Sequence, residues 1–101
     1  MSLEEKRRLI LSLDHLIRRK TPGTAIDMSR RLGVSRSTFF RLIEYMREDL
    51  VAPVSFDEDK GRYCYAQDGI IVIRFVPIEI IDMAKAKDIL GGTVKHLINL
   101  I

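Results

Sequence analysis

The stretch AIDMSRRLGVSRSTFFRLIEYM, residues 25–46, decides the fold of this chain. Apolar side chains recur with helical spacing at its beginning and at its end, and Gly33-Val34-Ser35 separates the two parts. Gly33 suits the left-handed residue that ends a helix, and Ser35 suits the cap of the next one. Small Ala25 and Ser29 allow the two helices to cross closely. The stretch therefore predicts a helix-turn-helix.

The second helix of this pair, expected over residues 35–48, has two different faces. At about 100° per residue, the apolar face consists of Phe39, Leu42, Ile43 and Met46. The opposite face holds Ser37, Arg41, Glu44 and Glu48, with Arg36 and Phe40 on its flank near the helix start. Burial of the apolar face would leave a polar and basic surface at the beginning of this helix.

A further helix is expected before this pair, over residues 3–20. Leu9, Ile10, Leu13, Leu16 and Ile17 form one helical stripe, and the polar residues, Asp14 among them, lie mostly elsewhere. Ser2 followed by Glu5, and Thr24 followed by Asp27, have the form of capping boxes. They mark the starts of the first and second helices.

The periodicity changes to two after Pro53. Val54 and Phe56 precede the loop Asp57–Gly61, and Tyr63 and Tyr65 follow it, which predicts a β-hairpin. Residues 70–76 are rich in β-branched side chains and predict another strand. Helical segments are expected over residues 77–90 and again after Thr93.

The fold class expected from these elements is α+β, and the chain divides into two parts. Residues 1–67 form a domain of three helices and a β-hairpin, and residues 68–101 form a strand-helix extension. From Ile70 to Ile101, 19 of 32 residues are apolar, which is more than a domain of this size can cover. We expect the extension to be a dimerisation segment; the alternative is a closed monomer whose tail wraps the first helix.

Charge is distributed unequally between the two halves of the chain. The whole chain carries a formal net charge of +3, but residues 1–47 hold eleven basic and five acidic side chains, whereas residues 48–101 hold six and nine. A basic half beside an acidic half is typical of a protein that binds a polyanion with one part only.

Several classes of function are not indicated. Cys64 is the single cysteine, and two histidines far apart in the chain make no metal-binding spacing, so we expect neither a metal nor a cofactor. There is no glycine-rich phosphate loop and no nucleophile motif, so an enzyme is not expected. The longest apolar run, residues 70–73, is far shorter than the roughly 20 residues of a membrane helix. A cytoplasmic protein without a membrane partner is expected.

The run from Leu32 to Glu44, followed by Ala52-Pro53-Val54 and Gly61-Arg62-Tyr63, resembles the winged helix-turn-helix of bacterial WYL-domain and DeoR-type transcriptional regulators. The resemblance covers about residues 5–66. It implies that the helix over residues 35–48 enters the DNA major groove and that the hairpin is the wing. Leu42 stands where the family commonly has an acidic residue, and we expect no sensor domain of the kind that usually follows.

The resemblance also implies a set of DNA-binding residues. Contacts to bases are expected from Arg36, Ser37, Phe40 and Arg41. Contacts to phosphates are expected from Thr24, Thr38 and Arg47, with Arg30 or Arg31 as further candidates. Lys60 and Arg62 are the cationic residues of the wing, whose acidic neighbours suggest a minor role. The alternative for Arg36 and Arg41 is a solvated helix face, and Glu44 can pair with Arg41 or Arg47.

The function expected from these observations is sequence-specific binding of double-stranded DNA by a homodimeric transcriptional regulator. The alternative is a protein-interaction module in which the apolar tail docks onto a larger partner and the basic half serves solubility. The salt dependence of binding distinguishes the two, because contacts to phosphates release counterions.

Overall fold

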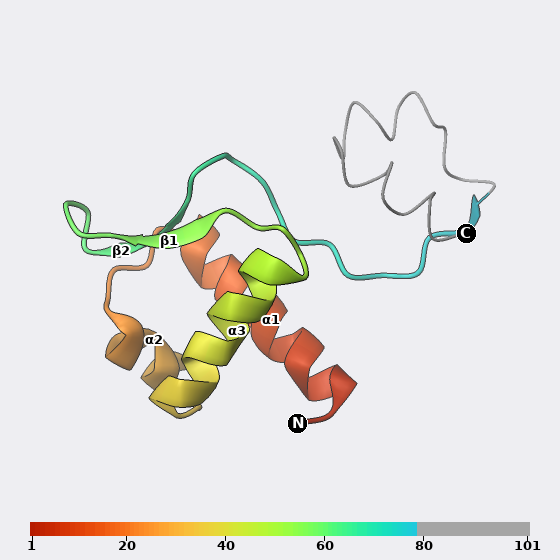
Figure 1. Ribbon diagram of the computed structural model, residues 1–101, viewed down its shortest axis with the longest axis horizontal. Coiled ribbons are helices and arrows are strands. Elements are labelled where there is room, and N and C mark those ends of the chain that lie inside the picture. Colours follow the sequence, from red (N-terminus) through yellow and green to blue (C-terminus); the bar gives the residue numbers. More distant parts are fainter. Residues whose placement is uncertain (79–101) are drawn as a thin grey trace.

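The computed structural model describes residues 1–78 (Figure 1). Three helices come first: α1 (Leu3–Arg18), α2 (Ala25–Leu32) and α3 (Arg36–Glu48). The strands β1 (Val54–Asp57) and β2 (Arg62–Tyr65) follow and pair as an antiparallel hairpin. The α+β prediction is confirmed, and three helices followed by a hairpin are consistent with a winged-helix layout.

Local signals set the helix boundaries. Ser2 Oγ accepts a hydrogen bond of 3.1 Å from the Glu5 amide, and Ser35 Oγ accepts one of 3.1 Å from the Thr38 amide. Gly33 ends α2 in the left-handed conformation, with a φ of 70°. The first helix ends at Arg18, two residues earlier than predicted, and Lys20 beyond it has a left-handed φ of 60°.

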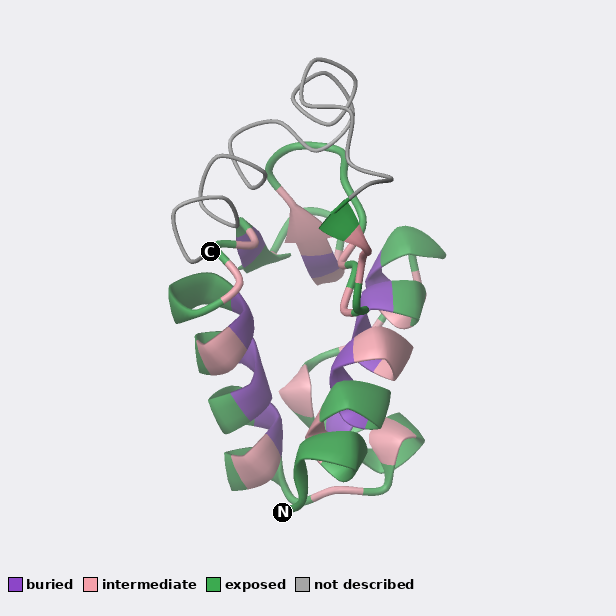
Figure 2. Ribbon diagram, turned by 90° about the vertical axis from the view of Figure 1, so that its right-hand side faces the viewer, coloured by how far each residue is buried: buried purple, intermediate pink, exposed green. Residues whose placement is uncertain are grey.

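The core lies between the three helices and the inner face of the hairpin. Buried residues line the sides of the helices that face one another (Figure 2). The core consists of Leu9, Ile10, Leu13, Ile17, Met28, Phe39, Leu42, Ile43, Met46, Val54 and Tyr63. Each large apolar side chain contributes about 1.5–3 kcal/mol when fully buried. All four residues of the predicted apolar face of α3 are among them, so that face is confirmed.

The hairpin is attached to the helices at several points. Val54 pairs with Tyr65 and Phe56 with Tyr63, so the predicted β-hairpin is confirmed. The Tyr63 ring lies 5.2 Å from the Phe39 ring and 5.2 Å from the Phe56 ring, both edge-on. The Gly23 amide donates a hydrogen bond of 2.9 Å to the carbonyl of Gly61, which joins the loop before α2 to the hairpin turn.

Asp14 departs from the expected pattern, because this charged residue is 1% exposed and belongs to the buried side of α1. Its Oδ2 accepts a hydrogen bond of 3.0 Å from Arg18 Nε, and its Oδ1 accepts one of 2.6 Å from the Tyr65 hydroxyl. Periodicity placed Asp14 among the polar residues outside the stripe. Its polar partners make the buried position tolerable.

The predicted strand over residues 70–76 is wrong: within the described residues the sheet has two strands, and 70–76 form neither helix nor strand. In Figure 1 this segment runs as a loop beyond β2. Ile71 and Ile73 pack against the core, and Arg7 Nε donates to the Ile73 carbonyl at 3.4 Å. β-Branched residues favour a strand only where another strand supplies hydrogen bonds. The helices predicted beyond Ile78, and with them most of the extension 68–101, lie outside the described residues.

Candidate nucleic-acid interface

The exposed side of α3 carries the four residues predicted to contact bases. Arg36, Ser37, Phe40 and Arg41 are all exposed, and Phe40 keeps 49% of its surface accessible although its ring lies 5.7 Å from that of Phe39. They are turned outward because Phe39 and Leu42, on the opposite side of the helix, are buried in the core. The structure therefore brings these four side chains together on one solvent-facing surface.

Positive charge is concentrated around the turn between α2 and α3. Arg30 and Arg31 lie in the last turn of α2, and the first turn of α3 has no acidic residue. Within residues 1–78 the one salt bridge joins Arg18 to Asp14 at 3.0 Å, so neither Arg30 nor Arg31 is held in an ion pair there, although both act on the charge of Asp27 at the start of α2. The partial positive charge of the N-terminus of α3 adds to theirs. This surface attracts anions.

Thr38 takes part in the cap of α3 and is half-buried. Its hydroxyl accepts a hydrogen bond of 3.0 Å from Ser35 Oγ, and its amide donates to the same oxygen. Because the Thr38 hydroxyl acts as the acceptor, its own proton is available for another group. Thr38 can therefore still donate to a phosphate at the helix start.

Thr24 is engaged within the fold. Its amide and its hydroxyl donate to Asp27 Oδ2, at 2.8 and 3.0 Å. These two hydrogen bonds, the backbone one first, hold the pKa of Asp27 below its ordinary value. The ionised Asp27 carboxylate therefore accepts hydrogen bonds from both groups of Thr24 that could donate to a phosphate. Its negative charge also lies beside them.

Arg47 joins α3 to the hairpin. Its Nε donates a hydrogen bond of 2.7 Å to the Val54 carbonyl, so only its terminal Nη atoms remain for a phosphate. The charge of Arg47 also acts on Tyr63, whose pKa is raised by burial and lowered in part by this guanidinium. Arg47 thus has a structural role in addition to the predicted one.

The two cations of the hairpin lie apart from α3. Lys60 is exposed in the turn, where its amide donates a hydrogen bond of 3.0 Å to Asp57 Oδ1. Arg62 is half-buried and opposite Asp57 in the register. In Figure 1 the turn extends beyond the helices. Glu58 and Asp59 are exposed in this turn, so the wing presents mixed charge to any polyanion.

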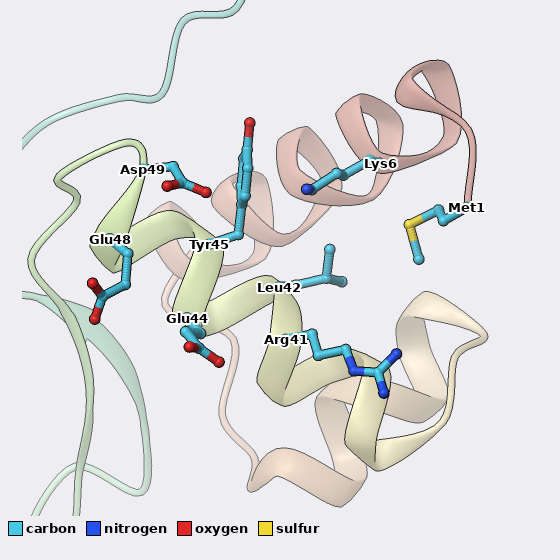
Figure 3. A pocket seen from close by; sticks show the side chains of 8 residues that line it. All are labelled: Met1, Lys6, Arg41, Leu42, Glu44, Tyr45, Glu48 and Asp49. Carbon is cyan, nitrogen blue, oxygen red and sulfur yellow. The ribbon is translucent and has the colours of Figure 1, made fainter.

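An open groove of about 460 Å³ lies between the start of α1 and the exposed side of α3 (Figure 3). It is lined by Met1, Lys6, Arg41, Leu42, Glu44, Tyr45, Glu48 and Asp49. Lys6 Nζ lies 3.7 Å from the centre of the Tyr45 ring, a cation–π contact that joins α1 to α3. Glu44, Glu48 and Asp49 lie toward one end of this groove, and Lys6 and Arg41 lie toward the end near Met1 (Figure 3).

Within residues 1–78 there is no group of three or more His, Cys, Asp and Glu side chains that could hold a metal ion. No helix in this part of the chain is long and apolar enough to cross a membrane.

Comparison with protein-family models, with curated proteins and with solved structures finds no match for this chain. The exposed surface of α3 is the candidate site that its own geometry supports.

Proposed function

We propose that this chain is a sequence-specific DNA-binding protein, a cytoplasmic transcriptional regulator without catalytic activity, which places the N-terminal half of α3 in the major groove. One observation carries the proposal. Arg36, Ser37, Phe40 and Arg41 share an exposed surface at the start of α3, whose first turn has no acidic residue. In helix-turn-helix proteins the first residues of the second helix contact base edges.

Each residue type at this surface suits a part of the duplex. Arg36 and Arg41 can bind guanine O6 and N7 through two hydrogen bonds, and Phe40 can contact a thymine methyl group. The Thr38 hydroxyl, the Nη atoms of Arg47 and the exposed Arg30 and Arg31 are suited to phosphates. The resemblance to WYL-domain and DeoR-type regulators supports the same arrangement, with the hairpin as a wing in which Lys60 and Arg62 have a minor role.

We propose further that the protein binds as a homodimer through residues 68–101. One helix-turn-helix reads few base pairs, and a two-fold dimer reads two half-sites about one helical turn apart. In the described beginning of this segment Ile70, Val72 and Phe75 are 61%, 53% and 88% exposed. Exposed side chains of this kind favour association.

The proposal is tested by fluorescence anisotropy with labelled duplex DNA selected from a random pool. If each subunit neutralises three or four phosphates, the slope of log K against log salt should be about −5 to −7 per dimer. Arg36→Ala with Arg41→Ala should reduce the discrimination between selected and unselected duplexes. Arg8→Ala with Arg19→Ala is the matched control, because it removes two exposed charges from the region of α1.

The same exposed apolar side chains also favour a second function, a protein-interaction module whose tail docks onto a larger partner. In that case binding to duplex DNA would be absent, or flat with salt and equal for all sequences. Light scattering at micromolar concentration adds a second criterion, because a mass near the 11.6 kDa of one chain would exclude the homodimer.

A further inference from the structure

Glu44 is an acidic residue on the surface that α3 presents to solvent, and within residues 1–78 no arginine forms a salt bridge with it. Arg47, three residues later, directs its Nε to the Val54 carbonyl at 2.7 Å. Arg41, three residues earlier, extends toward Met1, whereas the Glu44 carboxylate points elsewhere (Figure 3). Within residues 1–78 the one salt bridge is Arg18–Asp14. Both ion pairs that the helical spacing allowed are therefore absent from the described part of the chain.

Glu44 lies on the side of α3 that is proposed to face the major groove of DNA. Glu44 follows Ser37 by seven residues, which is close to two turns of about 3.6 residues each, so both project from the same strip of the helix. Arg41 is its neighbour at i−3. A helix that inserts Ser37 and Arg41 into the major groove brings the Glu44 carboxylate in with them.

A carboxylate in the major groove finds few hydrogen-bond donors on the base edges. Guanine offers N7 and O6 and thymine offers O4, all acceptors, whereas cytosine offers its N4 amino donor. Adenine N6 is a donor, but the N7 acceptor lies beside it. The surrounding phosphates repel the carboxylate at every sequence. Only cytosine therefore compensates fully for the insertion of Glu44.

We infer that Glu44 is a specificity-determining residue, which requires a cytosine at one position of each half-site, next to the base pair that Arg41 contacts. This inference rests on the proposed function and names the sequence class of its DNA target. The residue excludes other bases through an unmatched negative charge as well as selecting cytosine through a hydrogen bond.

The experiment compares the sequences that the full-length chain and its Glu44→Gln variant select from a random duplex pool. The unmodified chain should prefer cytosine at one position of the half-site by roughly 5- to 150-fold. Glu44→Gln should lose this preference and move toward adenine, because glutamine binds adenine N6 and N7 together. Glu44→Ala should lose it without a new preference.

Glu48→Gln is the matched control. Glu48 is exposed on the same side of α3, one turn closer to the C-terminus and farther from the residues that read bases. Glu48→Gln removes the same charge as Glu44→Gln and should raise the affinity for unselected duplex DNA to a similar extent. The preference for cytosine should remain. Circular dichroism verifies that the variants keep their helices.

The inference is overturned if the half-site has no cytosine position, or if Glu44→Gln and Glu44→Ala select the same sequence as the unmodified chain. In both cases the proposed function stands, because duplex binding is still observed. If the unmodified chain binds no duplex DNA, the proposed function and this inference fail together.

Discussion

The Tyr65 hydroxyl donates a hydrogen bond of 2.6 Å to Oδ1 of Asp14, and these residues lie 51 positions apart in the chain. The contact joins β2 to the C-terminal half of α1. Asp14 Oδ2 accepts its second hydrogen bond from Arg18 Nε, so both carboxylate oxygens have partners. In the described part of the chain no buried side-chain nitrogen or oxygen lacks one. This hydrogen bond to a buried carboxylate therefore helps to orient the hairpin on the helices, together with the Tyr63–Phe39 contact and the Gly23–Gly61 hydrogen bond.

Tyr65→Phe should lower the free energy of unfolding by about 1–3 kcal/mol, because it leaves one oxygen of a buried carboxylate without its donor. Urea denaturation followed by circular dichroism measures the change. Tyr45→Phe is the control, since Tyr45 is half-buried and its hydroxyl makes no hydrogen bond within residues 1–78. Equal losses for the two variants would show that the Asp14 contact contributes nothing specific.

Stability should fall at alkaline pH, and Tyr65 should contribute to that fall. Burial above all, then the hydrogen bond and the negative charge of Asp14, raise the pKa of Tyr65 well above its ordinary value. The folded state therefore keeps the proton after the unfolded state has lost it. The stabilisation is complete below about pH 10 and is lost above it, by on the order of 1 kcal/mol per pH unit.

The measurement for this alkaline effect is a series of urea denaturations between pH 8 and 11.5. Tyr65→Phe should show a shallower decline than the unmodified chain, and the remaining decline should include Tyr63, whose pKa is also raised by burial. Parallel curves for the two proteins would contradict the role of Tyr65.

Gly23→Ala should be clearly destabilising. Gly23 has a φ of 141°, and a Cβ there would lie 2.7 Å from the Asp27 Cβ at the start of α2. Strained backbone of this kind costs about 1–3 kcal/mol, and the overlap adds to it. Gly33→Ala is the comparison, because Gly33 has a φ of 70° and a Cβ would meet nothing within 4 Å. Its cost should be only about 1–2 kcal/mol.

Thermal unfolding compares the two glycine variants. The expected order of melting temperatures is the unmodified chain, then Gly33→Ala, then Gly23→Ala. A Gly23→Ala variant as stable as Gly33→Ala would mean that α2 shifts at little cost.

Val51→Asn should stabilise the protein by about 0.5–1 kcal/mol. Val51 is 80% exposed and has a left-handed φ of 55°, which is unfavourable for a β-branched residue, whereas asparagine tolerates it. Ser55→Asn is the control, because Ser55 is also exposed but has no positive φ. Its effect should be within about 0.5 kcal/mol. A loss of stability in Val51→Asn would contradict the strain.

The elements with strong local signals were predictable. The Ser2 and Ser35 caps, the left-handed Gly33 and the alternation from Val54 to Tyr65 act over a few residues, so their effect can be inferred without a partner. Residues 70–76 are rich in β-branched side chains, which favour a strand, but a strand also needs another strand to pair with. Propensity alone could not supply that partner.

The exposed positions of the candidate site residues on α3 were also predictable from local signals. Helical periodicity predicted that Arg36, Ser37, Phe40 and Arg41 point outward, because Phe39 and Leu42 on the opposite side of the same helix are buried. It could not show how neighbouring segments engage individual side chains. The hydrogen bond from Arg47 to the Val54 carbonyl depends on folded geometry, whereas the contact of Thr24 with Asp27 belongs to the capping box that the sequence predicted.

The sequence by itself determined the helix-turn-helix, the hairpin and the basic exposed face of α3, because spacing, caps and turn residues act locally. Only the tertiary structure decided that Asp14 is buried and bonded to Tyr65, that Arg47 is held by the hairpin and that Glu44 forms no ion pair within residues 1–78. These three outcomes arise between segments that are distant in the chain or from the directions side chains take after packing. No periodicity along the sequence encodes them.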